Sequence, residues 1–317
     1  MRIATRIAMT LVIAGAAGLA SLAQGPNPDP DGPFLGRWDL TLKDAKAEYP
    51  SWIEIGKNDG KLTALFTGRW GNARPLPRIA IEGTQLTFVS PKEEEGATAD
   101  MLFQGGRNGE SLSGTVTGPD GTTWSWTGVK APELKSTALP KWGKPIELFD
   151  GKDLKGWRQS KAGPPDWSVK DGSLITPGNG PEIISDKKFG DFKLHVEFNC
   201  GKESNSGIYL RGRYEVQIET DSQAEPPSHH TGGVYGFLEP KPEQARSPDA
   251  WQTFDITLIG RRVTVVQNGA TVIDNQEIPG LTGGALDSHE GEPGPIYLQG
   301  SEKGHVLFRK ITVTPAK

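Results

Sequence analysis

Short runs of alternating apolar and polar residues, separated by turns rich in glycine and proline, constrain the fold of this chain most. The 41 glycines and 25 prolines make up roughly a fifth of the 317 residues, well above the usual share of about 12%. Period-two alternation is typical of half-buried strands, and no segment has a sustained helical stripe. The sequence therefore predicts an all-β protein. The clearest runs are residues 38–42, 52–55, 62–66, 86–89, 124–126, 192–198, 214–219, 254–258, 263–267, 296–299 and 306–313.

The runs fall into two blocks. Residues 24–33 contain little that could be buried and are expected to be a flexible lead-in. Residues 34–130 are expected to form a small β-barrel or β-sandwich domain, and residues 131–145, which have no periodicity, a linker. With many short strands, residues 146–315 are expected to form an antiparallel two-sheet jelly-roll sandwich.

Residues 1–23 have the features of a secretory signal peptide. Arg2 and Arg6 precede an apolar stretch, and Ser21-Leu22-Ala23 form a small-residue cleavage site. The apolar stretch, residues 7–20, is shorter than the ~20 residues that a membrane-spanning helix needs. We therefore expect a periplasmic or secreted protein that has no stable membrane insertion after cleavage.

Charge and cysteine content exclude several classes of function. With 35 Lys and Arg against 39 Asp and Glu, the formal charge is −4, which argues against a nucleic-acid partner. The single cysteine, Cys200, excludes an intramolecular disulfide and a multi-thiolate metal site.

The polar face of residues 214–219 is the best candidate for a site. If Tyr214, Val216 and Ile218 face the core, then Glu215, Gln217 and Glu219 share the other face, with successive Cα atoms ~6.6 Å apart. Glycosidases place two carboxyl groups ~5–5.5 Å or ~6.5–9.5 Å apart. The backbones of Glu215 and Glu219 are then roughly 13 Å apart. Because their side chains can lean together, the spacing permits sugar chemistry, although a solvated sheet face would have the same pattern.

Nearby side chains add sugar-binding character. Tyr209 and Arg211 precede the acidic strand, and Tyr297 and Gln299 alternate with apolar residues. Aromatic rings can stack on a sugar ring, while amide, guanidinium and carboxylate groups bind its hydroxyls. The adjacent His229 and His230 lie in a loop, where they can carry protons or bind a metal.

Five motifs of the second block together resemble the 3-keto-disaccharide hydrolase family, a former domain of unknown function with a concanavalin-like jelly roll. They are LFDGKDLKGW (148–157), NSGIYLRGRYEVQI (205–218), GVYG (233–236), WQTFDI (251–256) and GPIYLQ (294–299). The resemblance covers nearly all of residues 146–315 and does not extend to residues 34–130.

The resemblance implies an oligosaccharide or glycoside substrate whose sugar C3 hydroxyl has been oxidised to a ketone. The ketone acidifies the C2 hydrogen, a base removes it, and elimination followed by hydration cleaves the glycosidic bond. We expect Glu215 or Glu219 as the base, and Arg211, His230 or a divalent cation such as Ca²⁺ to stabilise the enolate oxygen. No organic cofactor is expected. The expected substrate-binding residues are Tyr209, Arg211, Gln217, Tyr297 and Gln299.

Two other classes of function stay open. Jelly rolls host lectin-like carbohydrate-binding modules as readily as hydrolases. The Glu-x-Gln-x-Glu pattern also resembles the Glu-x-Asp-x-Glu pattern of retaining endo-glycosidases, with Gln217 in place of the central aspartate.

Overall fold

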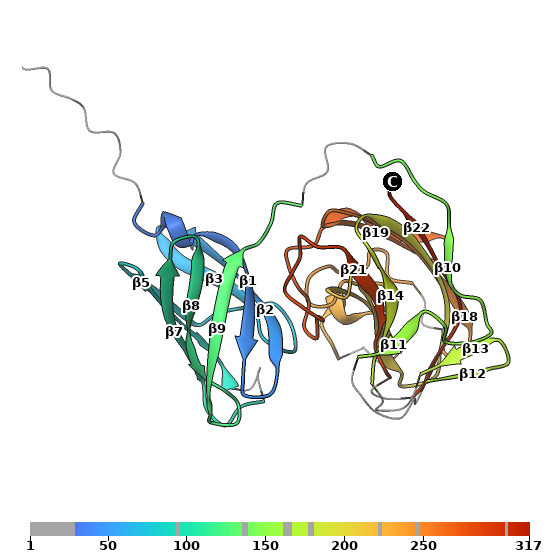
Figure 1. Ribbon diagram of the computed structural model, residues 1–317, viewed down its shortest axis with the longest axis horizontal. Coiled ribbons are helices and arrows are strands. Elements are labelled where there is room, and N and C mark those ends of the chain that lie inside the picture. The colour runs from blue at the N-terminus through green and yellow to red at the C-terminus, as the bar shows by residue number, and fades with distance from the viewer. Residues whose placement is uncertain are drawn as a thin grey trace, which may run out of the picture.

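The computed structural model describes residues 29–92, 96–134, 139–160, 167–176, 181–220, 224–244, 247–301 and 304–317. The predicted signal peptide and the middle of the predicted linker lie outside these residues. The described chain is built from antiparallel β-sheets and two short 3₁₀ turns, η1 (Gly32–Phe34) and η2 (Pro227–His229). The strands form two units that lie side by side (Figure 1).

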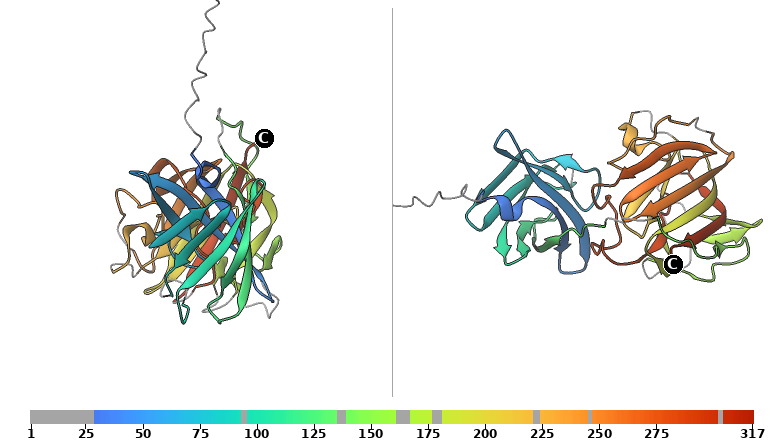
Figure 2. Two further views of the ribbon diagram at one scale, coloured as in Figure 1. Left: turned by 90° about the vertical axis from the view of Figure 1, so that its left-hand side faces the viewer. Right: turned by 90° about the horizontal axis from the view of Figure 1, so that it is seen from above.

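The first unit is a single curled antiparallel sheet. Its strand order is β4-β3-β2-β1-β9-β8-β7-β6-β5, and β5 approaches β3, so that the sheet nearly closes on itself (Figure 2). Inside it lies an aromatic-rich core that includes Trp38, Phe66 and Trp126. This arrangement is the barrel-like form of the small β-domain expected from the sequence. The strands are β1 (Gly36–Lys43), β2 (Glu48–Asn58), β3 (Lys61–Thr67), β4 (Arg74–Pro75), β5 (Arg78–Glu82), β6 (Gln85–Ser90), β7 (Met101–Asn108), β8 (Ser111–Thr117) and β9 (Thr123–Lys130).

The second unit is a sandwich of two antiparallel sheets. The outer sheet runs β12-β13-β22-β15-β18-β19-β20, with β10 paired to β22, and the inner sheet runs β11-β14-β21-β16-β17. The strands of the outer sheet are β10 (Ile146–Phe149), β12 (Ser168–Lys170), β13 (Ser173–Ile175), β15 (Phe192–Cys200), β18 (Trp251–Ile259), β19 (Arg262–Gln267), β20 (Ala270–Glu277) and β22 (Val306–Pro315). Those of the inner sheet are β11 (Trp157–Gln159), β14 (Ile183–Phe189), β16 (Asn205–Leu210), β17 (Tyr214–Glu219) and β21 (Gly294–Leu298).

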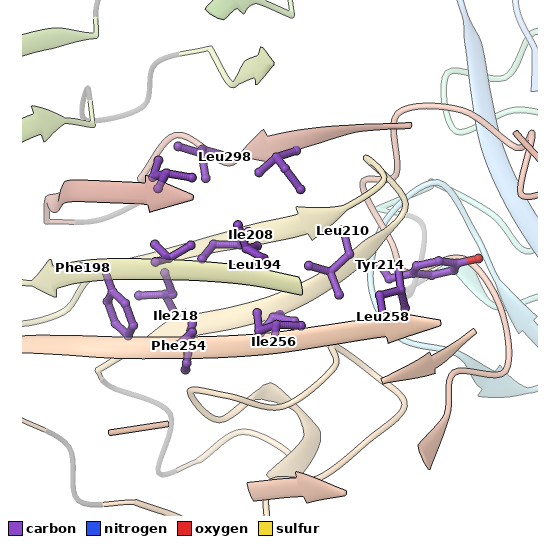
Figure 3. Packing of buried hydrophobic residues seen from close by; sticks show 14 of the residues in the cluster. Leu194, Phe198, Ile208, Leu210, Tyr214, Ile218, Phe254, Ile256, Leu258 and Leu298 are labelled. Atoms are coloured by element: carbon purple, nitrogen blue, oxygen red, sulfur yellow. The ribbon is translucent and has the colours of Figure 1, made fainter. Parts of the chain in front are cut away.

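The core of the sandwich follows from the alternation in the sequence. Along β15 every second residue, from Phe192 to Cys200, is buried, and these side chains meet those of the inner sheet between the two layers (Figure 3). Because β22 pairs between β13 and β15, and β21 between β14 and β16, the end of the chain completes both sheets. The predicted all-β fold with an antiparallel two-sheet jelly-roll sandwich is confirmed.

The two units share a tightly packed boundary. Trp52 from β2 belongs to the core of the second unit and meets Phe237 edge to face, with ring centroids 5.7 Å apart. A Cβ atom on Gly280 would lie 2.3 Å from the Trp52 indole, so only glycine permits this approach. In the predicted linker, Trp142 forms a β-bridge with Ala316.

None of the helices in the described part of the chain has the length and apolar character that a membrane crossing requires.

Candidate active site

The outward face of β17 carries the polar residues that the alternation indicates. Tyr214, Val216 and Ile218 lie in the sandwich core, which places Glu215 and Gln217 on the opposite face. That face is not solvated, because Glu215 is 3% exposed and Gln217 is 1% exposed. Loops of both units cover it, and a burial this deep is unusual for a carboxylate on the outer face of a sheet.

Beneath this cover lies a pocket of about 210 Å³. It is polar and brings together four residues expected from the sequence, namely Tyr209, Glu215, Gln217 and Gln299. The remaining lining residues are Trp70, Gly71, Asn205, Tyr235 and Gly283.

Glu215 is held in a fixed position on the pocket wall. The Tyr209 hydroxyl donates a hydrogen bond to Glu215 Oε2 at 2.8 Å, and the Glu215 backbone N–H donates to Thr282 Oγ1 at 3.1 Å. On the paired strand, Gly207 leaves the space that the carboxylate occupies, since a Cβ atom there would lie 2.1 Å from Oε1. The glycine therefore permits the position of the acid.

The phenol beside Glu215 keeps its proton at neutral pH. Burial first, and the Glu215 charge second, hold the pKa of Tyr209 well above its ordinary value. The protonated hydroxyl can donate to Glu215 Oε2 at 2.8 Å or to the carbonyl oxygen of Gly283 at 2.9 Å. Tyr297 lies behind Tyr209, with the two rings stacked at a centroid distance of 4.4 Å, and burial likewise raises the pKa of Tyr297. Tyr297 supports the site and does not line the pocket.

Two amide oxygens of the pocket have no protein partner within the described residues. They are Gln217 Oε1 and Gln299 Oε1, both buried. The other end of Gln217 is engaged, because its Nε2 donates to Glu219 Oε2 at 3.2 Å and lies 3.4 Å from Asn205 Oδ1. A buried acceptor without a partner costs free energy. A ligand with hydroxyl groups would supply the missing donors.

His229 contacts a residue of the pocket, whereas the sequence analysis had favoured His230. His229 stacks on the pocket residue Tyr235 with ring centroids 4.2 Å apart, and burial lowers its pKa even though Glu225 opposes the shift. Its Nε2 contacts Asn72 Oδ1 of the first unit. His230 does not line the pocket, and its Nδ1 lies 3.0 Å from Glu243 Oε1.

Arg211 and Glu219 also lie outside the pocket lining. Arg211 is in the turn after β16 with a φ of 54°, and its Nη2 donates to the carbonyl oxygen of Gly260 at 2.6 Å. Alternation fails for Arg211 because the strand has already ended at Leu210. Glu219, at the end of β17, borders a separate small cavity beside Cys200 and Thr231.

The residues that the sequence analysis missed have two origins. Asn205 and Tyr235 lie within the motifs that carry the family resemblance, so the signal for them was present. Trp70, Gly71 and Gly283 had none, because they reach the pocket through the contact between the two units. Among the described residues, no group of three His, Cys, Asp or Glu side chains could hold a metal ion.

Comparison with known proteins identifies the family of this chain. The family described as 3-keto-alpha-glucoside-1,2-lyase-like domain matches residues 144–314, more than half of the chain. The chain belongs to this family. The first unit lies outside the family match.

Individual relatives are more distant. The chain is 33% identical over 105 residues to a 3-keto-disaccharide hydrolase of Bacteroides thetaiotaomicron, a match that covers 29% of this chain and 36% of that protein. The chain thus spans about a third of that curated relative. Among solved structures, a protein assigned as a glycosyl hydrolase from Parabacteroides distasonis is 28% identical, with a TM-score of 0.47, and the match covers 58% of this chain and 96% of the other.

Proposed function

We propose that this protein cleaves the glycosidic bond of 3-keto-disaccharides or related 3-keto-glycosides, with Glu215 as the base that removes the C2 proton. The observation that carries the proposal is a single carboxylate, fixed by Tyr209 and the space at Gly207, on the wall of a buried polar pocket. Family membership and the curated relative support a substrate of this kind.

The proposed reaction needs one well-placed base. The Glu215 carboxylate takes the C2 hydrogen as a proton, the C2–H electron pair forms a C2=C3 bond, and the ketone becomes an enolate. When the ketone re-forms, the electrons shift to C1=C2, the C1–O bond breaks, and the leaving oxygen takes up a proton. Water then adds at C1 while a proton returns to C2, so that the net reaction is hydrolysis.

The composition of the pocket favours this route over ordinary retaining hydrolysis. A retaining glycosidase uses two carboxyl groups about 5–5.5 Å apart. Of the residues that line the described pocket, Glu215 is the one with a carboxylate. The amide side chains of Asn205 and Gln299 line the same pocket and can donate hydrogen bonds to the enolate oxygen.

The decisive experiment compares two substrates and three proteins. Product release is measured from a 3-keto-disaccharide and from the same disaccharide unoxidised, with wild type, Glu215→Gln and Glu219→Gln. We expect turnover of the ketone alone, a fall of about 10² or more in Glu215→Gln, and a smaller effect in Glu219→Gln. Running each assay with and without a chelator tests whether a divalent cation stabilises the enolate.

Other outcomes would replace the proposal. Turnover of both sugars would indicate an ordinary glycosidase, and sugar binding without turnover of either would indicate a lectin-like module. Undiminished turnover in Glu215→Gln would exclude Glu215 as the base.

We also propose that the chain is exported, on the basis of residues 1–23. N-terminal sequencing of the native protein should find a start near Gln24 in a periplasmic or secreted fraction. A cytosolic product that retains Met1 would refute export.

A further inference from the structure

The loop that follows β3 of the first unit is attached directly to the pocket. The Gly284 backbone N–H donates to the carbonyl oxygen of Arg69 at 3.2 Å, and Asn72 contacts His229. Gly283 packs against Gly71 so closely that a Cβ atom on Gly283 would lie 2.5 Å from the Gly71 carbonyl oxygen. Backbone contacts on both sides of Trp70 therefore fix where its side chain can lie.

Trp70 is unusual among the tryptophans of the chain. Trp70 is one of the residues that line the pocket, yet it is 50% exposed. The Arg69 guanidinium lies 4.9 Å from its ring centroid and 3.7 Å from that of Tyr49, which supports the indole from its own unit. An indole that is half exposed beside a pocket keeps a large apolar surface open to solvent, where a ligand can pack on it.

The size of the pocket shows what this surface can meet. Pockets for drug-sized ligands measure roughly 300–1,000 Å³, and this one is about 210 Å³, which suits one sugar ring. The buried acceptors Gln217 Oε1 and Gln299 Oε1 call for hydroxyl donors on that ring. The second half of a disaccharide must then leave the pocket, and Trp70 is the most exposed of the aromatic residues that line it.

We propose that Trp70 is the stacking platform for the leaving-group sugar, so that the first unit completes the substrate site of the second. This inference rests on the proposed function, which decides that the 3-keto sugar occupies the pocket and that the other sugar is the leaving group. It assigns a role to a unit outside the family match and makes the protein selective for glycosides whose leaving group is itself a sugar ring.

The test uses the full-length protein and two substrates, a 3-keto-disaccharide and the methyl glycoside of the same 3-keto sugar. In Trp70→Ala we expect KM for the disaccharide to rise about tenfold while kcat changes less than about threefold. The methyl glycoside, which has nothing to place on the indole, should be nearly unaffected. Trp70→Phe should restore much of the loss. Trp251→Ala is the matched control, because Trp251 is also solvent-exposed (36%) but stacks on Arg309 away from the pocket.

A binding measurement separates this inference from the proposed function. Calorimetric titration of the disaccharide is carried out with Glu215→Gln and with Glu215→Gln/Trp70→Ala, so that no turnover is required. Weaker binding in the double variant supports the platform even if the wild type proves to be a lectin. Equal binding by the single and double variants, or a Trp70→Ala effect of the same size on the disaccharide and the methyl glycoside, overturns the platform whether or not the enzyme acts on ketones. Failure of the wild type to bind or cleave either sugar would overturn both.

Discussion

Substitution of Gly207 by alanine tests whether the site depends on the space that this glycine leaves. An alanine Cβ would lie 2.1 Å from Glu215 Oε1, 2.7 Å from Cγ and 2.8 Å from Cδ. Ordinary Cβ contacts begin at 3.4 Å, so the carboxylate would have to withdraw by about 1 Å or more. A shift of this size would break the 2.8 Å hydrogen bond from Tyr209 and costs about 10²-fold in rate.

The same substitution should destabilise the fold. Overpacking a buried site costs about 1–3 kcal/mol, and Gly207 has an ordinary φ that alanine can adopt, so the clash is the main cause. Removing the acid in Gly207→Ala/Glu215→Ala should relieve the clash and give a coupling of about 0.5–3 kcal/mol.

Urea denaturation measures the free energy of unfolding, and product release measures the rate. Gly190→Ala is the control, because a Cβ atom there meets nothing within 4 Å. Near-normal turnover in Gly207→Ala, or additive stability effects in the double variant, would show that the carboxylate is not confined as described.

Three further predictions concern the contacts around the site. Tyr209→Phe should lower kcat about tenfold with little change in KM, because it removes the donor to the Glu215 carboxylate and keeps the stacking on Tyr297. An unchanged kcat in steady-state kinetics would contradict this. Trp52→Ala should lower the free energy of unfolding by about 3–5 kcal/mol, as measured in urea, because a fully buried indole is lost from the core of the second unit. Burial, and after it the Glu290 charge, raises the pKa of Asp39 to about 9, so the contribution of Asp39 to stability is complete below pH ~4 and is lost as the pH rises toward 9. Asp39→Asn should flatten this decline, which is up to about 1.4 kcal/mol per pH unit. The melting temperature is measured at pH 5 and pH 9, and an equal fall between the two in wild type and variant would refute the prediction.

The strands were predictable because alternation is a local property of the sequence. Along β17 the apolar residues point into the sandwich and Glu215 and Gln217 point away from it, as the pattern requires. The burial of the polar face of β17 was not predictable in the same way. Its burial depends on the loop at Thr282 and Gly283 and on Trp70, which are distant in sequence and give no periodic signal.

Arg211 shows the limit of extending a pattern past the end of a strand. Its left-handed conformation in the turn after β16 sends the guanidinium to the carbonyl oxygen of Gly260. A pattern of two-residue steps cannot indicate where a strand gives way to a turn. Alternation therefore predicts correctly that Tyr209 and Gln217 share the face that lines the pocket, and it fails at Arg211, two residues after Tyr209.

The boundary between the units explains why the pocket cannot be read from the second unit alone. Gly236 and Gly283 lie where side chains would collide with Asn72 and Gly71 of the first unit. Such close contact between the two segments holds the loop of Trp70 in one position on the second unit. Because glycine has no side chain, no flexible group lies between the segments that could adjust if the loop moved. The catalytic carboxylate we propose comes from one unit and the mouth of its pocket from the other, so selectivity for the leaving group can vary through the first unit without change at Glu215.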